Sequence, residues 1–389
     1  MNPEPSSLTE RTLELLTWLA VETGPRPAGS AAEESARARL ADLLRQAGFR
    51  VERTTFAFAP QPTYAPYYLI AGIAFLISAG LLLFFPWLVL PLPLLVNGLP
   101  ELALWLDSRR PRTGQSANLL ALPGAAQPAD LDLLLVAHLD TAAAQPLGGE
   151  FWYRWRTSIF RVMHRLSLVV ALVGVLWGMG LTLPPAILIA AAGVSGLLGI
   201  ALAAQDLWEQ LGARGKWSPG ANDNASGAAL LAALAEQLGR AAPAGLKVGF
   251  LFTSAEETGL HGAQAAAAAL KGIKARVLNV DMVGSGSYLR LITRAGTFAS
   301  VRTDPALNAL LERADPLIRP LAYVRRSGDF VPFLREGFAA GCIEAGGAPR
   351  FWRVYHTGGD SLEIIDRAMI DHAAEVLTQL VWIMDKDKP

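Results

Sequence analysis

Two long apolar regions interrupt this 389-residue sequence and limit what it can fold into. The first, residues 67–106, opens with an uncharged run of about twenty residues, the length of a helix that crosses a bilayer. The second, residues 166–204, contains no charged residue. Prolines mark a turn near Pro86 in the first region and at Pro184 in the second. We therefore expect two transmembrane hairpins, residues 66–106 and 166–204, with about four transmembrane helices in all.

Alternatives to membrane crossing stay open for both regions. Residues 87–106 contain several prolines, Asn97 and Glu101, which need protein cover at membrane depth, so a re-entrant or tilted segment is an alternative there. Either region could instead be a pair of buried core helices. Residues 151–165 alternate aromatic rings with arginines, which suits the lipid headgroup layer. We expect an interfacial amphipathic segment there, with a solvated basic helix as the alternative.

The composition agrees with contact to lipid and excludes some partners. Charged residues make up 17% of the chain, against about a quarter in an average soluble domain. The formal net charge is zero, so nothing points to a nucleic acid or another polyanion. The single cysteine, Cys342, excludes an internal disulfide and a cysteine-based zinc cluster. The acidic, polar N-terminus does not resemble a signal peptide.

Outside the apolar regions, strand patterns alternate with helix patterns. Residues 131–137 are a near-continuous apolar run, typical of a strand that is covered on both faces. Further strands are expected at 49–58, 117–122, 246–252, 277–283, 288–293 and 339–343, and helices at 8–47 (broken near Gly24), 228–238, 263–270, 306–314 and 362–384. This alternation predicts an α/β fold: a mainly parallel, mixed sheet with helices on both faces.

Residue types that bind metal ions follow several of the expected strands. They are His138 and Asp140, Glu256 and Glu257, and Asp281, and two further candidates, Asp223 and His356, lie in loops. Ligands of an open α/β sheet gather beyond the carboxyl ends of its strands, so we expect these side chains to converge. Histidines with carboxylates and no thiolate suit a hydrolytic zinc site.

Hydrolysis at such a site also needs residues beyond the ligands. Two metal ions need a bridging carboxylate, and hydroxide generated between them attacks a peptide carbonyl. Another carboxylate must accept the proton of the water and pass it to the leaving amine. A ligand histidine needs an acceptor for its second ring nitrogen, and Asp140 is well placed to hold His138.

These residues and their surroundings resemble metallopeptidase family 28, the di-zinc aminopeptidases and their relatives. The matching motifs are His138-Leu139-Asp140, GANDNASG at 220–227, AEETGLHG at 255–262, NVDMVG at 279–284 and YHTGGDS at 355–361, in the order of the family. SGDFVPF, residues 327–333, is similar to the family's segment before the last ligand. The resemblance covers essentially the whole chain outside the apolar regions.

The resemblance implies two zinc ions and a role for each candidate residue. The ligands would be His138, Asp223, Glu257, Asp281 and His356, with Asp223 as the bridge, His138 and Asp281 on one ion, and Glu257 and His356 on the other. Glu256 would be the catalytic base, and Asp140 and Asp360 would support the ligands from behind. A plain helix N-cap is the alternative for Asp360. His164 and His261 match no ligand position.

The expected protein is a membrane-anchored di-zinc exopeptidase, an aminopeptidase that acts on peptide substrates. Its peptidase domain would comprise residues 1–65, 107–150 and 205–389. Arginines flank the apolar regions on the side of this domain, and the hairpin turns carry no basic residue, which predicts a multi-pass protein of the cell membrane with a cytoplasmic peptidase domain. Carboxypeptidase or glutaminyl cyclase activity and a non-catalytic membrane adaptor are the alternatives. Because a cyclase needs only one metal, five ligands favour hydrolysis.

Overall fold

The computed structural model describes residues 5–60, 65–81, 87, 90–92, 109–181, 185–296, 300–323 and 326–388. The chain divides into two compact units. The sheet unit comprises residues 1–61, 112–144 and 216–389, and the helical unit comprises residues 62–111 and 145–215. Each unit is described by itself.

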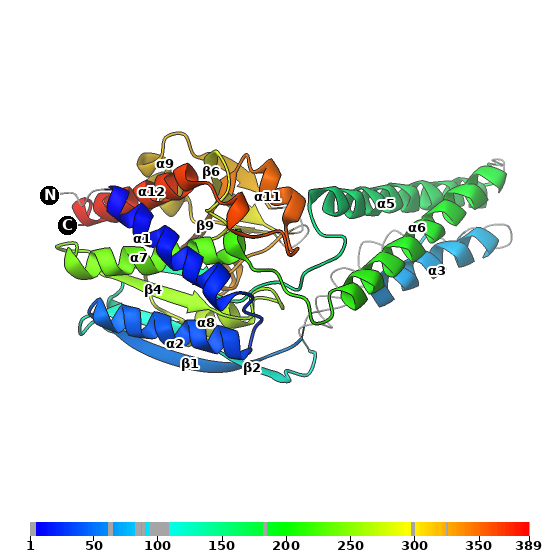
Figure 1. The fold of residues 1–389 in the computed structure, drawn as a ribbon. Helices are drawn as coiled ribbons and strands as arrows, with labels where there is room; N and C mark the ends of the chain where they lie inside the picture. The colour runs from blue at the N-terminus through cyan, green and yellow to red at the C-terminus, as the bar shows by residue number, and fades with distance from the viewer. Residues whose placement is uncertain are drawn as a thin grey trace. The chain divides into compact units, whose positions relative to one another are not determined.

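The sheet unit is built on one nine-stranded mixed sheet (Figure 1). Its strands are β1 (Phe49–Phe58), β2 (Gly114–Pro123), β3 (Leu133–His138), β4 (Val248–Thr253), β5 (Arg276–Val280), β6 (Tyr288–Ala295), β7 (Val301–Arg302), β8 (Arg319–Ala322) and β9 (Ala340–Gly346). They lie in the order β1-β2-β4-β3-β5-β9-β6-β7, and β8 pairs with β6. The central strands β4, β3, β5 and β9 are parallel, whereas the pairs β1–β2, β2–β4, β6–β9 and β6–β7 are antiparallel. The predicted α/β fold with a mixed sheet is confirmed, and the parallel strands form the centre of the sheet.

Helices cover both faces of this sheet, as the burial of its central strand β3 shows. Every residue of β3 is buried, and successive side chains of a strand point to opposite faces. Leu133 and Leu135 pack with α1 (Pro5–Thr17), α2 (Ala31–Gln46), α7 (Ser226–Arg240), α9 (Pro305–Ala314) and α12 (Arg367–Lys386). Leu134 and Val136 pack with α8 (His261–Ala269) and α10 (Phe330–Arg335). Figure 1 shows α1, α7 and α12 side by side on one face.

One helical prediction, with its break, is confirmed, and another differs from the structure. The helix expected at 8–47 is α1, a π-helical turn Trp18–Thr23 and, after a break at Gly24, α2. The closing helix expected at 362–384 is interrupted: Leu362–Ile364 is a short 3-10 turn, and α12 begins after Asp366. The cause is local, since the Asp366 side chain accepts the N–H of Ala368 and so caps a new helix.

The helical unit contains α3 (Ala65–Leu81), α5 (Glu150–Gly178) and α6 (Pro185–Gly212). Two of them have segments long and apolar enough to cross a membrane, residues 154–178 and 189–212, and the apolar part of α3, residues 65–78, is shorter. Only 33% and 44% of the apolar windows of the two long helices are buried, which fits buried core helices poorly.

The prediction of about four transmembrane helices is therefore too high for the part of the chain that the structure describes. It holds two candidate spans, and residues 93–106, most of the expected second crossing, lie outside the described ranges. Residues 151–165 form the first half of α5, which no proline interrupts before Gly178. Their place in the lipid headgroup layer stays a prediction.

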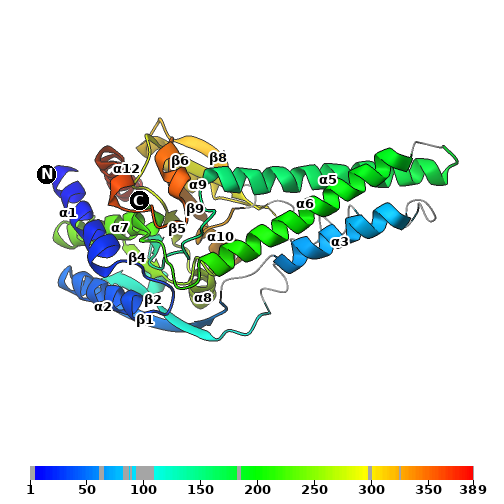
Figure 2. The same cartoon turned by 45° about the vertical axis from the view of Figure 1, so that its right-hand side comes forward.

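Glycines and one polar cluster hold the helical unit together. A Cβ atom on Gly199 of α6 would lie 2.7 Å from the Cα atom of Gly72 in α3, so these helices touch through their backbones. Where α3 and α5 begin and α6 ends, Asp206 accepts the N–H of Ala65 at 2.8 Å, and Arg156 binds Glu209 at 2.8 Å. The three helices run alongside one another in Figures 1 and 2.

Candidate metal centre

The predicted ligands converge at the carboxyl ends of the parallel strands. His138 is the last residue of β3, and Asp281 directly follows β5. Glu257 lies in the loop after β4. Asp223 lies in a π-helical turn, Ala221–Ala225, that leads into α7, and His356 follows the short helix α11 (Pro349–Val354). Strand ends and helix starts thus bring together residues that are far apart in the sequence.

Asp223 stands between two groups of possible ligands. Its Oδ1 atom lies 3.2 Å from Nε2 of His138, which lies 3.6 Å from Oδ1 of Asp281. Its Oδ2 atom lies 3.2 Å from Nε2 of His356, which lies 3.2 Å from Oε2 of Glu257. The ligand atoms in each group of three lie within 4.8 Å of one another. One oxygen of the Asp223 carboxylate therefore faces His138, and the other faces His356.

The electrostatics of these groups fit divalent cations. The Oε1 atom of Glu257 and the Oδ1 atom of Asp281 are buried and have no hydrogen-bond partner among the described residues. Burial raises the pKa values of both carboxyls above their usual range. Burial opposes the charged form of His356 too, yet the carboxylates of Glu257 and Asp223 outweigh it and raise its pKa to about 10. Such an excess of carboxylate charge, with donors of the type that zinc prefers, fits metal ions.

Glu256 adjoins the ligands without belonging to either group around Asp223. Its carboxylate lies within 4.8 Å of ligand atoms of His138 and Glu257. Burial raises the pKa of Glu256 well above its usual value, and the nearby carboxylates of Glu257 and Asp329 add to the rise against the pull of His138. A carboxyl with a raised pKa beside a hydrolytic site can accept and return a proton.

Asp140 lies behind the ligands, but it does not hold His138 in the expected way. The Nδ1 atom of His138 lies 3.1 Å from the main-chain carbonyl oxygen of Asp140 and 3.6 Å from its carboxylate. The carboxylate instead accepts the backbone N–H groups of Glu256 at 3.1 Å and Glu257 at 3.2 Å. The main-chain carbonyl thus faces the ring, and the side chain orders the Glu256–Glu257 loop.

Asp360 supports Asp223 and does not cap the last helix. Its carboxylate is fully buried and accepts the backbone N–H groups of Asn222 at 2.8 Å and Asp223 at 3.1 Å. Burial raises the pKa of Asp360 to about 7, and the charge of Asp223 adds to the effect. The N-cap of α12 is Asp366, so the N-cap alternative for Asp360 is wrong.

Three residues near the site had not been singled out from the sequence. Asp329, from the SGDFVPF segment, is buried and accepts a hydrogen bond from Thr253 at the end of β4, and burial raises its pKa to about 7. The ring of Tyr355 stacks on His356 with a centroid separation of 3.9 Å. The third residue is Arg26, which is fully buried.

Arg26 ties together the loops that carry the ligands. Its guanidinium donates to the carbonyl oxygens of Leu19 at 2.6 Å, Gly24 at 2.7 Å and Leu139 at 3.0 Å. It also reaches the carbonyl of Gly220, at 3.3 Å, next to the turn that holds Asp223. One side chain thus fixes the backbone beside His138 and the backbone beside Asp223.

The comparison with protein families covers the C-terminal part of the chain. Residues 205–381 match the model of Peptidase family M28. The matched region contains four of the five predicted ligands, Asp223, Glu257, Asp281 and His356, as well as Glu256.

Solved structures share the fold over almost the entire chain. The leucine aminopeptidase precursor of Bacteroides thetaiotaomicron has a TM-score of 0.56 at 14% identity, with 97% of each chain covered. The zinc aminopeptidase BSAP of Bacillus subtilis has a TM-score of 0.57 at 16% identity, with 98% of this chain and 96% of that chain covered. The glutaminyl cyclase of Porphyromonas gingivalis has a TM-score of 0.53 at 15% identity, with 98% of each covered. This chain therefore combines a match to Peptidase family M28 over residues 205–381 with the fold of the zinc aminopeptidases and glutaminyl cyclases.

Proposed function

We propose that this protein is a di-zinc aminopeptidase. The position of Asp223, with one oxygen toward His138 and the other toward His356, is the observation that carries the proposal. His138, Asp223 and Asp281 would hold one zinc ion, and Asp223, Glu257 and His356 the other. The match to Peptidase family M28 and the fold shared with zinc aminopeptidases support the same reading.

Each residue of the site would have its own role in the proposed hydrolysis. Bound zinc supplies a Lewis acid and lowers the pKa of water so that it can attack at neutral pH. Glu256 accepts the proton of the attacking water and delivers it to the leaving amine. Asp140 keeps the backbone of Glu256 and Glu257 in place, and Asp360 does the same for Asp223.

Glutaminyl cyclisation is the second candidate, because cyclases share the fold. A cyclase needs one metal, so the complete second ligand group favours hydrolysis. The test uses zinc-loaded protein in detergent and three peptides: Leu-Gly-Gly, its N-acetylated form and Gln-Gly-Gly. An aminopeptidase should release free leucine from Leu-Gly-Gly but not from its N-acetylated form. Formation of pyroglutamate from Gln-Gly-Gly, without release of leucine from Leu-Gly-Gly, would show a cyclase. No product from any of the three peptides would favour a non-catalytic membrane adaptor.

We also propose that the helical unit anchors the protein in the cell membrane with the peptidase domain in the cytoplasm. The apolar composition and exposed faces of α5 and α6 support the anchoring, and the arginines of residues 109–112 and 154–165 support the orientation. The helix α5 begins ten residues after Asp140, so the catalytic edge and the anchor are covalently close. A C-terminal reporter that works only in the cytoplasm should be active, and activity of a reporter restricted to the opposite side would contradict the orientation.

A further inference from the structure

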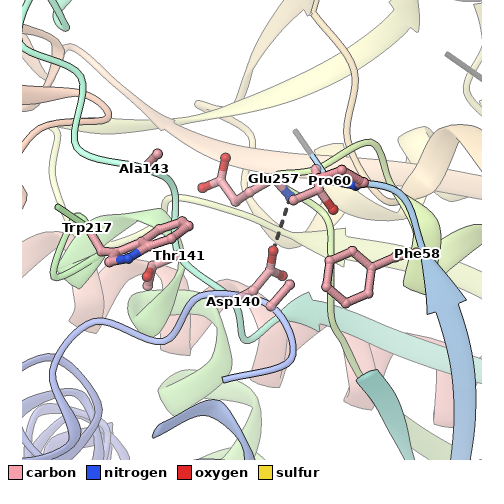
Figure 3. Close-up of a pocket in the computed structure, with 9 residues that line it drawn as sticks. Phe58, Pro60, Asp140, Thr141, Ala143, Trp217 and Glu257 are labelled. Carbon is pink, nitrogen blue, oxygen red and sulfur yellow. Dashed lines mark hydrogen bonds between the residues drawn. The ribbon is translucent and has the colours of Figure 1, made fainter. Parts of the chain in front are cut away.

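A cavity of about 140 Å³ lies in the sheet unit beside the proposed metal centre (Figure 3). Phe58 and Trp217 stand on opposite sides of it, and Asp140 and Glu257 lie between them. Pro60 and Ala143 add further apolar surface. An apolar cavity of roughly 150 Å³ accommodates one benzene ring, so this one has room for a single apolar side chain.

The cavity borders the loop that carries the proposed base. Its lining includes Glu257 and Thr258, the residues that follow the proposed base Glu256. The base must reach the leaving amine, so the leaving peptide lies near this loop. Another apolar cluster, with Met282 and Phe351 at its centre, adjoins the ligands through Met282, which follows Asp281, and through Tyr355, which precedes His356. Its core side chains are buried and pack against one another, and in the proposed arrangement the first side chain of the substrate lies on that side of the ligands.

The chain connections to the helical unit leave from the cavity wall. Pro60 lies two residues before residue 62, Ala143 two residues before residue 145, and Trp217 two residues after residue 215, the limits of the helical unit. Ala143 and Trp217 form an antiparallel bridge, flanked by hydrogen bonds from the N–H of Ala144 to Lys216 at 3.0 Å and from the N–H of Ser218 to Ala142 at 2.9 Å. This bridge holds Trp217 in place although its side chain is 39% exposed.

We infer that the cavity between Phe58 and Trp217 binds the side chain of the second substrate residue and selects an apolar one. This inference rests on the proposed aminopeptidase function. It assigns to Trp217 a part in specificity: its ring removes the second side chain from water, and Pro60 and Ala143 complete the apolar wall. The substrates are then peptides with a large apolar second residue.

The test compares hydrolysis of Leu-Leu-Gly and Leu-Gly-Gly by the full-length, zinc-loaded protein in detergent. The wild type should prefer Leu-Leu-Gly, and Trp217→Ala should lower that preference about tenfold, the low end of what one or two methylene groups contribute in an apolar pocket. Activity on Leu-Gly-Gly should fall much less than activity on Leu-Leu-Gly, because glycine places no side chain in the cavity. Trp208→Ala is the matched control, since Trp208 of α6 is 64% exposed and lies outside the cavity.

A second variant fills the cavity instead of opening it. Ala143→Leu should lower the activity on Leu-Leu-Gly far more than the activity on Leu-Gly-Gly, whereas a damaged fold would lower both equally. The inference would be overturned if Trp217→Ala and Ala143→Leu each changed the hydrolysis of both peptides equally. It would also be overturned if either variant changed the preference for the first residue, measured as Leu-Leu-Gly against Gly-Leu-Gly. A wild type that cleaves none of these peptides would refute the proposed function, whereas a wild type that cleaves Leu-Gly-Gly and Leu-Leu-Gly equally would refute only the inference.

Discussion

The carboxylate of Asp140 accepts a hydrogen bond from the backbone N–H of Glu256, with Oδ1 and N 3.1 Å apart. The other oxygen accepts the N–H of Glu257 at 3.2 Å. Glu256 is the proposed base and Glu257 a proposed ligand, so one buried side chain positions both. The main-chain carbonyl of the same residue holds the ring of His138.

Asp140→Asn should therefore lower kcat and zinc affinity together, by about 10- to 100-fold, as is usual for residues that orient ligands. An asparagine offers one oxygen and one NH2 group, so one of the two N–H donors would face another donor. Turnover of Leu-Gly-Gly and zinc binding measure the effect. Asp132→Asn is the control, because Asp132 also accepts a backbone N–H, that of Lys247 at 2.8 Å, but at the surface. Turnover within twofold of the wild type would rule out this role of Asp140.

Neighbouring glutamates should separate metal binding from proton transfer. Glu256→Gln should keep both metal ions and lose turnover by about a hundredfold or more, since the amide cannot accept the proton. Glu257→Gln should lower the metal content, because the neutral amide is a poorer zinc ligand. Metal analysis and kcat of both variants check the prediction. Wild-type turnover in Glu256→Gln would show that another group is the base.

The metal-free protein should lose stability as pH rises. Burial raises the pKa of both Asp329 and Asp360 to about 7, against about 3.9 in an unfolded chain. The folded state then binds more protons than the unfolded state, so the free energy of unfolding falls between about pH 4 and 7. The pKa of His356, raised to about 10, continues the fall at higher pH.

Bound zinc should oppose this loss of stability at higher pH, because it takes the place of the protons and neutralises the negative charge of the carboxylates. Thermal unfolding in detergent should show a zinc-induced rise of Tm that is larger at pH 7.5 than at pH 5.5 by about 4 °C or more, which corresponds to about 1–2 kcal/mol. A metal-free protein whose Tm increases from pH 5.5 to pH 8 would contradict the assignment of these buried carboxyls.

Two glycines of α6 should respond oppositely to alanine. A Cβ on Gly199 would lie 2.7 Å from Gly72, whereas a Cβ on Gly193 meets nothing within 4 Å among the described residues. Gly199→Ala should therefore cost about 1–3 kcal/mol through overpacking. Gly193→Ala should be neutral or stabilise by up to about 1 kcal/mol through helix propensity. The fraction that stays monodisperse after heating in detergent measures this, and equal behaviour of the two variants would argue against the contact between α3 and α6.

The sequence predicted the sheet and the convergence of the ligands well, because both depend on local patterns. The alternating apolar run marks β1 to the residue and the continuous run marks β3 to within two residues, and His138, Asp281 and Glu257 lie at or after strand ends. Asp366 shows where such patterns fail: the closing helix reads as continuous, and a single side-chain cap divides it.

Contacts between distant segments were not predictable in the same way. Arg26 binds carbonyls of residues 19, 24, 139 and 220, which only the folded chain brings together. Asp329 lies in the SGDFVPF segment, but its bond to Thr253 forms only when the fold brings the start of α10 to the end of β4. Asp140 was expected to supply the acceptor for His138, but the spacing of two residues does not determine which of its oxygens faces the ring, and the structure shows the main-chain carbonyl.

Zinc titration of the metal-free protein, with release of free leucine from Leu-Gly-Gly as the readout, tests the central claim most directly. The proposed bridging role of Asp223 predicts that activity reaches its maximum at two equivalents of zinc per chain and that Asp223→Asn abolishes it. A maximum at one equivalent, or no leucine released at two equivalents, would contradict a di-zinc aminopeptidase.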